Sequence, residues 1–397
     1  MSFSIFNSDI IFCSSEKIIT FNCETKKECS IELPKLIVDK DIKSHNKLDF
    51  DTCHGITSVT FSSDGQYYCV CTNRKQLCLY KYPDNVLVSN RTLSRAASKV
   101  QFTPKNDIVV ADKSGDVYLY RTNPKSFKKP DEPDKSDGIL ILGHLSMLLD
   151  VLVTENNLFI ITADRDEKIR VSRFPNSYNI ESYCLGHTKF INNISELPHD
   201  KNILVSTGGD GDFKFWNYIV GEELKSVSYS DQINEDDVKR LNENLKKFDL
   251  ATEEITAIPV KHMRLMKLDD LSSILALSFY GNGDILFYII VGTFPHELKI
   301  NFVQKITNNS EPLECIFYNR QFWILFDDGL KVYKYEHKHF VDNVEFNKVF
   351  ENFNKSWTLL RSKVNEASFY PILYKRKFDS VQEYQERKKS RLMNLME

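Results

Sequence analysis

The sequence predicts an all-β protein, a seven-bladed β-propeller with a C-terminal helical extension. Three observations support this prediction: two neighbouring segments repeat at a fixed spacing, weaker copies of the same pattern flank them, and the period becomes helical near the C-terminus. A chain of 397 residues would more often form two or three domains, but one closed all-β ring can reach this length.

The repeat is clearest in the middle of the chain. "LGHLSMLLDVLVTENNLFIITADRDEKIRVSRF" begins at Leu142, and "LGHTKFINNISELPHDKNILVSTGGDGDFKFWNY" begins at Leu185. Their Gly-His pairs, at 143–144 and 186–187, are 43 residues apart. This spacing fits the WD repeat, which has a period of about 40–45 residues and also opens on Gly-His. Within each unit apolar runs alternate with polar turns, which indicates four strands.

Weaker copies of the unit lie on both sides of this pair. They show the same order of apolar run, Gly- or Asp-containing turn and apolar run, and they occupy residues 11–33, 56–82, 97–122, 255–290 and 313–335. The total is about seven units, a common number for a ring that closes its own sheet edges.

Two stretches interrupt the repeat, and the end of the chain leaves it. Residues 231–250 are charged and lack Gly and Pro, which predicts a helical or mobile insertion, and residues 127–138 form a charged, proline-containing loop. We expect the propeller to span 1–339 and a helical extension with a basic tail to span 340–397. A capping-box pattern at Asp342 and Glu345 precedes the helix, which should pack on the propeller through Phe346, Val349, Phe350, Phe353, Trp357, Leu360 and Val364.

The composition limits the function classes. The net charge of −3 does not suit a protein that coats nucleic acid by itself. No apolar run approaches the roughly 20 residues that span a bilayer, and the N-terminus lacks a signal-peptide pattern. Nine irregularly spaced cysteines indicate a reducing compartment. We therefore expect a soluble intracellular protein without a membrane partner.

Groups that resemble a catalytic triad occur twice, at equivalent positions of the repeat. An enzyme needs one such set beside an oxyanion hole. In WD repeats the same hydroxyl, imidazole and carboxylate form a structural network, so we assign that role to His144, Thr162 and Asp166 in one repeat and to His187, Ser206, Asp210 and Trp216 in the next.

No metal, cofactor or small-molecule site is expected. Cys69, Cys71 and Cys78, with Cys53 and His54 nearby, lack the second paired knuckle of a zinc site, and the first two should fill core space. The "GGDGD" stretch at 208–212 has no following Lys-Ser/Thr, so it is a blade turn and no phosphate-binding loop.

A charged turn, "ADRDEKIR" at 163–170, is the candidate binding site. Gly-His loops and third-strand turns emerge on one face of a propeller, and charges of both signs beside apolar residues suit a protein partner. The alternative is an ordinary solvated turn. The predicted partner-binding residues are Asp164, Arg165, Glu167, Lys168, Arg170, Leu145, Met147, Lys189 and Phe190.

The C-terminal basic run has two interpretations. Arg387, Lys388, Lys389 and Arg391 form a solvated helix face, or they add salt-dependent phosphate contacts to a nucleic acid held mainly by another chain.

The repeats at 107–218 resemble the WD-repeat, non-catalytic subunit family of the tRNA (guanine-N7) methyltransferase, called Wuho in insects. The resemblance is based on "ADKSGDVY", "ILGHLSMLLDV", "FIITADRDEKIRVSRFP", "CLGHTKFI" and "STGGDGDFKFWNY", and on "LYKRKFDSVQEYQERKK" near the end. Ser172-Arg173 and Trp216-Asn217 depart from it, since they replace the Trp-Asp of WD repeats.

This resemblance implies a heterodimer with a separate Rossmann-like methyltransferase, which binds S-adenosylmethionine and methylates N7 of a guanine in the tRNA variable loop. The present chain would bind no cofactor, would hold the enzyme in its active conformation, and would meet tRNA mainly through that partner. Arg170 would pair with an acidic residue of the enzyme. The resemblance also implies a nuclear location, with the cytoplasm as a second possibility. A rival hypothesis is a scaffold or substrate receptor of another complex, such as a ubiquitin ligase; another is direct nucleic-acid binding through the tail.

Overall fold

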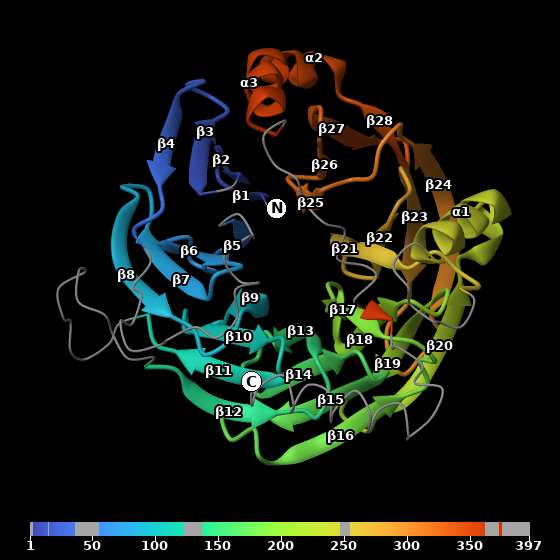
Figure 1. The fold of residues 1–397 in the computed structure, drawn as a ribbon. Coiled ribbons are helices and arrows are strands. Elements are labelled where there is room, and N and C mark those ends of the chain that lie inside the picture. Colours follow the sequence, from blue (N-terminus) through green and yellow to red (C-terminus); the bar gives the residue numbers. More distant parts are fainter. Residues whose placement is uncertain are drawn as a thin grey trace.

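Seven four-stranded antiparallel sheets surround a central axis in the computed structural model (Figure 1). The structure describes residues 3–14, 16–35, 55–122, 137–246, 255–361 and 373–374. The predicted seven-bladed WD-type propeller is therefore confirmed. No helix in these ranges is long and apolar enough to cross a membrane.

Each blade consists of four consecutive strands. Blade 1 contains β1 (Phe3–Phe6), β2 (Asp9–Ser14), β3 (Lys17–Asn22) and β4 (Glu28–Glu32); blade 2 contains β5 (Ile56–Phe61), β6 (Tyr67–Thr72), β7 (Gln76–Lys81) and β8 (Val86–Thr92). Blade 3 contains β9 (Ala97–Phe102), β10 (Ile108–Asp112), β11 (Asp116–Tyr120) and β12 (Ile139–Gly143); blade 4 contains β13 (Leu148–Val153), β14 (Phe159–Asp164), β15 (Lys168–Arg173) and β16 (Ile180–Leu185). Blade 5 contains β17 (Ile191–Leu197), β18 (Asp200–Gly208), β19 (Asp212–Asn217) and β20 (Glu222–Ser228). Blade 6 contains β21 (Val260–Asp269), β22 (Ser272–Phe279), β23 (Asp284–Val291) and β24 (Lys299–Thr307); blade 7 contains β25 (Glu314–Tyr318), β26 (Gln321–Phe326), β27 (Gly329–Glu336) and β28 (His339–Asp342).

The core lies between neighbouring blades. Middle strands such as β6, β10 and β22 are almost entirely buried, because both of their faces pack against the next sheet, whereas outer strands such as β4 and β16 are largely exposed. Cys69 and Cys71 of blade 2 pack against Val100 and Ile108 of blade 3, as small apolar side chains do. The burial pattern explains why middle strands have continuous apolar runs while outer strands alternate.

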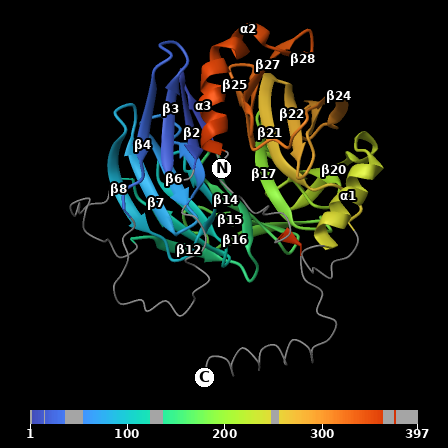
Figure 2. The same ribbon diagram turned by 45° about the horizontal axis from the view of Figure 1, so that its top comes forward.

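The ring closes without exchanging a strand between its first and last blades. Because every sheet is made of consecutive strands, blades 1 and 7 meet at a seam. A helical segment fills this seam (Figures 1 and 2); it comprises α2 (Val344–Asn347), η3 (Lys348–Phe350) and α3 (Glu351–Arg361). Its buried Phe350, Phe353 and Trp357 pack against Phe12 and Phe21 of blade 1 and against blade 7. We call this segment the clasp.

Two asparagines of the clasp pair with the half of β27 that β28 does not cover. The short β28 bonds only the second half of β27, from Tyr333 to Glu336. Beside the first half, the Asn354 amide accepts from the N–H of Leu330 (2.8 Å) and donates to its carbonyl oxygen (3.3 Å). The Asn347 amide does the same with Val332, at 2.8 and 3.2 Å. These side chains therefore replace the missing length of strand.

The helical predictions are correct in type and wrong in one cap. Asn343, and not Asp342, caps α2, because its side chain accepts from the Phe346 N–H; Asp342 accepts from the Asn347 side chain. The insertion at 231–250 contains α1 (Glu235–Lys246), which buries Leu241 and Leu245 against blades 5 and 6. Residues 127–136 of the predicted loop, Val364 and the side chain of Leu360 lie outside the described part. Strand β28 runs across the predicted boundary at 339/340.

The clasp yields a stability prediction. We expect Trp357→Ala to destabilise the protein by about 3–5 kcal/mol, because it removes a fully buried ring from the seam and the hydrogen bond from its Nε1 to the Phe326 carbonyl (2.9 Å). Lys355→Ala, on the exposed side of the same helix, is the matched control. Chemical denaturation would measure both variants; equal midpoints would contradict a closing role for the clasp.

Candidate functional site

Two histidine networks join the loop that precedes the first strand of a blade to the second strand of the same blade. In the blade-4 network, His144 bonds Asp164 Oδ2 through Nδ1 (3.0 Å) and Thr162 Oγ1 through Nε2 (2.8 Å). In the blade-5 network, His187 bonds Asp210 Oδ2 and Ser206 Oγ, each at 2.7 Å. Ser206 Oγ also accepts from Trp216 Nε1 at 2.7 Å. The groups are buried and mutually satisfied, which is the geometry of a structural staple.

The assignment of Asp166 to the first network is wrong; the carboxylate is that of Asp164. Asp164 ends β14 and is buried, and its Oδ1 also accepts from the N–H groups of Asp166 (2.8 Å) and Lys168 (3.1 Å). The sequence shows this arrangement twice, because Ala163-Asp164 repeats Ala111-Asp112 of blade 3. Asp112 likewise accepts from the N–H groups two and four residues later. Asp164 is therefore unavailable to a partner.

The charge state of Asp210 follows from its contacts. Burial by itself would raise the pKa of Asp210, but the hydrogen bond and charge of His187 and the N–H of Thr188 lower it below the ordinary value. The carboxylate thus stays ionised inside the blade. This arrangement fixes a loop and presents no nucleophile to solvent.

Arg170 takes the place of a tryptophan. Ser172 and Trp216 occupy equivalent positions of β15 and β19, and the Trp216 ring lies under Gly186. In blade 4 the guanidinium of Arg170 donates instead to Ser172 Oγ (2.9 Å), to the carbonyl of Gly143 (3.2 Å) and to the carbonyl of Ser177 (3.0 Å). Arg170, predicted only as a partner-binding residue, therefore also has an internal structural role. All three acceptors are neutral, so its charge is not compensated by them.

Phe190 does not belong to an exposed surface. Its side chain is buried beneath Gly208 and Gly209, where a Cβ on Gly209 would lie 2.6 Å from the ring. The ring of Tyr374 covers it edge-on at 5.2 Å. Met147, the equivalent residue of blade 4, is partly buried against the same core. In both repeats the third residue after the histidine points inward.

The remaining turn residues form a mixed surface with two side chains that the sequence analysis missed. Lys168 is paired across β15 and β16 with Leu185, and Arg170 with Tyr183, so each cation shares a sheet face with an apolar neighbour. Leu185 and Tyr183 are 62% and 41% exposed, and Leu145 is fully exposed. In the sequence, the apolar Tyr183 and Leu185 of the outer strand β16 could have indicated this surface. We call Leu145, Arg165, Lys168, Arg170, Tyr183 and Leu185 the blade-4 surface.

The other predicted binding residues are not part of the blade-4 surface. Glu167 has a positive φ of 70° in the turn, and Lys189 is partly exposed in the next Gly-His loop. Arg387, Lys388, Lys389 and Arg391 lie outside the described residues, as do Cys53 and His54.

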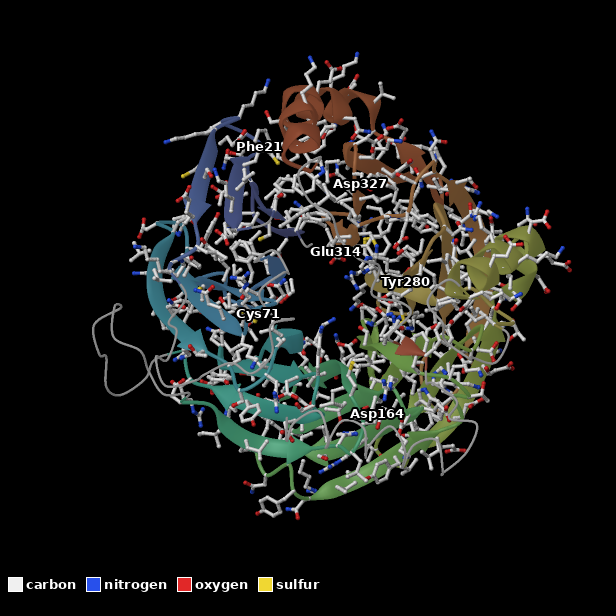
Figure 3. All side chains as sticks on the ribbon, in the orientation of Figure 1. Phe21, Cys71, Asp164, Tyr280, Glu314 and Asp327 are labelled. Carbon is white, nitrogen blue, oxygen red and sulfur yellow. The ribbon has the colours of Figure 1, made fainter. Side chains whose placement is uncertain are left out.

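Two cavities are lined by described residues, and neither has the features of a catalytic or metal site. The central channel, about 640 Å³, is lined by Lys99, Arg264 and Glu314, among others. Ion pairs join neighbouring blades here: Lys99 with Asp150 (3.2 Å) and Arg264 with Glu314 (2.5 Å). Figure 3 labels Glu314 and Tyr280 beside the channel. Burial would raise the pKa of Glu314, but His262 and Arg264 lower it to about 2. These charges neutralise one another and tie the blades together.

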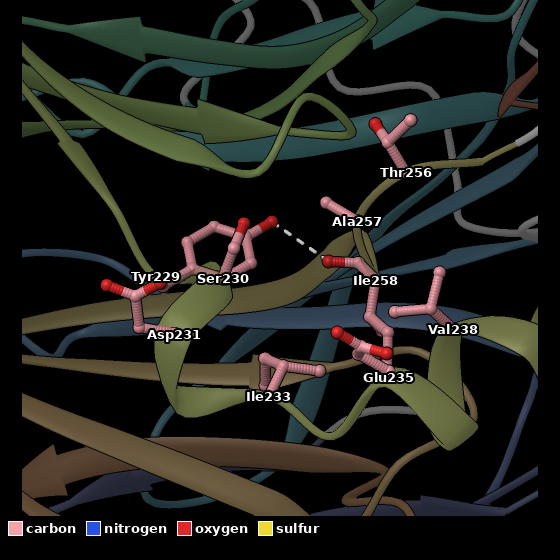
Figure 4. A pocket seen from close by; sticks show the side chains of 9 residues that line it. All are labelled: Tyr229, Ser230, Asp231, Ile233, Glu235, Val238, Thr256, Ala257 and Ile258. Atoms are coloured by element: carbon pink, nitrogen blue, oxygen red, sulfur yellow. Dashed lines mark hydrogen bonds between the residues drawn. The ribbon is translucent and has the colours of Figure 1, made fainter.

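The second cavity, about 380 Å³, lies where the insertion meets blade 6 (Figure 4). The Tyr229 hydroxyl crosses it to the Ile258 carbonyl at 2.9 Å. Among the described residues no group of three or more His, Cys, Asp or Glu side chains is arranged to hold a metal ion. Burial raises the pKa of Cys71 to about 12, so this cysteine remains a neutral thiol, which is a poor metal ligand.

The fold and these networks define a WD-repeat propeller, and comparison with known proteins gives the family. Residues 122–323 match the family model described as the tRNA methyltransferase TRM82 WD40 domain. The chain is 32% identical to the tRNA (guanine-N(7)-)-methyltransferase non-catalytic subunit wdr4 of Danio rerio, over 85% of this chain and 77% of that protein. It is 30% identical to the Xenopus laevis subunit, over 92% and 88%. The chain therefore belongs to the family of WD-repeat non-catalytic subunits of tRNA (guanine-N7) methyltransferases.

Other matches are narrower or show the fold alone. The Mus musculus subunit is 37% identical, but the alignment spans 57% of this chain and half of that protein. A chain in the crystal structure of the mitotic checkpoint complex superposes with a TM-score of 0.59 over 82% of this chain and 83% of its own length, at 11% identity. At such identity the likeness concerns the propeller architecture only.

The corrected network yields a second prediction. We expect Asp164→Ala to lower the free energy of unfolding by about 1–3 kcal/mol, since His144 and the N–H groups of the turn lose their acceptor inside the blade. Asp166→Ala should cost clearly less, because Asp166 is partly exposed in the turn. Thermal unfolding of both variants decides between the two aspartates; the reverse order would restore the original assignment.

Arg170 yields a third prediction. We expect Arg170→Leu to lower the unfolding midpoint of the isolated chain, because three hydrogen bonds are lost and the buried Ser172 hydroxyl loses its donor, at a cost of about 1–3 kcal/mol. Arg173→Leu is the control: Arg173 also lies on β15, and its more exposed ion pair with Glu181 of β16 should be worth less than about 1 kcal/mol. If Arg170→Leu melted like the unaltered chain, the hydrogen bonds of the Arg170 guanidinium would not contribute to the stability of the blade.

Proposed function

We propose that this chain binds the catalytic subunit of a tRNA (guanine-N7) methyltransferase through the blade-4 surface. By holding that enzyme in its active conformation, it enables methylation of N7 of a guanine in the tRNA variable loop. The two proteins form a heterodimer, and tRNA is held mainly by the enzyme. This assembly acts in the nucleus.

The observation that supports the proposal is the pairing of cations with exposed apolar side chains at one corner of blade 4. Lys168 is exposed and lies beside Leu185, and Leu145 projects from the adjacent loop. The Nε of Arg165 is buried and donates to no atom of the described residues. Apolar side chains bordered by uncompensated cations suit an acidic, partly apolar surface on a protein.

Arg170 would act as the central cation of that contact. Its guanidinium is held by three neutral oxygens, so it is oriented without being neutralised. Pre-orientation lowers the conformational entropy lost when a partner carboxylate binds. The predicted pairing of Arg170 with an acidic residue of the enzyme thus fits the contacts of Arg170, and the internal bonds would position it.

The test uses residues without a structural network of their own. We expect Lys168→Glu and Leu185→Asp each to weaken binding of the catalytic subunit tenfold or more, about 1.4 kcal/mol, because a like charge or a buried charge then faces an acidic or apolar partner surface. Lys105→Glu and Leu158→Asp are the controls. Both lie in connections between the first and second strands of a blade, at the opposite end of the propeller.

Calorimetry with the purified catalytic subunit, and tRNA N7-methylation by the mixture, would measure both effects. Equal loss in all four variants, or loss in the controls alone, would place the enzyme elsewhere and contradict the proposal.

A further inference from the structure

Three connections at one end of blades 2 and 3 contain cations and no acidic residue. They are the turn between β6 and β7 (73–75), the loop between β8 and β9 (93–96) and the turn between β10 and β11 (113–115). Their basic residues, which we call the basic row, are Arg74, Lys75, Arg95 and Lys113. Arg95 and Lys113 are exposed, and the other two are partly exposed.

The acidic residues of the same connections lie at the opposite end. The turns from the first to the second strand contain Asp64 in blade 2 and Asp107 in blade 3, and the turn between β7 and β8 contains Asp84. The whole chain has a net charge of −3, so the basic row does not reflect a general excess of cations. The two ends of these blades therefore differ in the sign of their charge.

Backbone hydrogen bonds hold the three connections side by side. The N–H of Leu93 donates to the carbonyl of Lys75 at 2.7 Å, and the N–H of Lys113 donates to the carbonyl of Ala96 at 3.2 Å. Arg95 lies between these two bonds along the chain. Covalent and hydrogen-bond geometry thus keeps its Cα atom within about 14 Å of the Cα atoms of both lysines.

The same kind of bond continues the row to the blade-4 surface. The N–H of His144 donates to the carbonyl of Gly115 at 2.7 Å, and the N–H of Arg165 donates to the carbonyl of Met147 at 3.0 Å. Blades 2, 3 and 4 follow one another around the ring (Figure 1). A molecule that extends from the proposed enzyme contact over the neighbouring blades would therefore meet the basic row.

The chemistry of the row differs from that of the blade-4 surface. None of the exposed large apolar side chains of the described residues lies in these three connections, whereas blade 4 presents Leu145, Tyr183 and Leu185. Protein interfaces have an apolar centre, but interfaces with nucleic acids are polar and strongly basic. The row also contains the exposed Ser94 and Ser114, whose hydroxyl groups can donate to phosphate oxygens.

We propose that the basic row binds phosphates of the tRNA that the partner enzyme holds. The inference rests on the proposed function, because it requires the heterodimer. Within the described residues neither Lys75 nor Arg95 forms an ion pair, so both charges are available to a polyanion. Contacts of this kind orient the RNA on the complex without reading its sequence.

The experiment measures tRNA binding by the purified heterodimer over a range of KCl concentrations. We expect Lys75→Ala and Arg95→Ala each to flatten the slope of log affinity against log salt by about one unit, and the double variant by about two, because each lost phosphate contact releases about one counterion fewer. The bonds that order the row join backbone atoms, so both variants should fold normally.

The matched control combines Lys81→Ala with Lys105→Ala. Both lysines are exposed at the opposite end of blades 2 and 3, and they form no part of the row. The control removes the same charge from the chain and should retain the original slope. Equal flattening in the control would reduce the effect to the overall charge of the protein and overturn the proposal.

Calorimetry of the double variant with the purified catalytic subunit separates RNA contacts from protein contacts. We expect unchanged affinity for the enzyme, since the blade-4 surface is intact. Weaker assembly of the heterodimer would assign the row to a protein contact and overturn the inference. A normal heterodimer with an unaltered salt slope would refute this inference alone, whereas failure of the unaltered chain to bind the enzyme would refute the proposed function.

Discussion

Closure of the ring is the constraint on which the other features depend. Seven sheets pack face to face only if the first and last also meet, and here no strand passes from one to the other. The apolar side chains of the clasp fill the seam, and the Asn347 and Asn354 amides satisfy the backbone of β27 where β28 is too short. Without such closure an open sheet edge and a partly exposed core would remain, both of which favour aggregation.

Within the closed ring, polar networks set the position of each loop. Asp164 and Asp210 hold the histidines of neighbouring blades through the same geometry. Asp164 lies two residues after the hydroxyl residue Thr162, whereas Asp210 lies four residues after Ser206. The guanidinium of Arg170 takes the place of an indole. The same side chain therefore packs within the blade and has the charge that an intermolecular contact would need. The rigidity of these loops matters for binding, because a pre-formed surface loses little entropy when a partner docks.

The C-terminal extension has two separate attachments to the ring. The clasp belongs to the seam, and Leu373 with Tyr374 belongs to the core of blades 5 and 6. The first fills the seam between blades 1 and 7, and the second covers the Phe190 ring in the loop before β17.

The sequence by itself determined the number of blades, the insertion, the helical extension and the family, because these depend on periodicity and on motifs that are local in the chain. It also located the charged turn. Only the tertiary structure decided which side chains of that turn are available. Asp164, Arg170 and Phe190 have the residue types of a binding surface, yet their side chains contact His144, Gly143 and Tyr374, which the fold brings close to them. Asn347 and Asn354 are ordinary polar residues in a helical pattern until the unpaired half of β27 lies beside them. Burial and hydrogen bonding are set by neighbours from other blades, and a one-dimensional pattern contains no information on those neighbours.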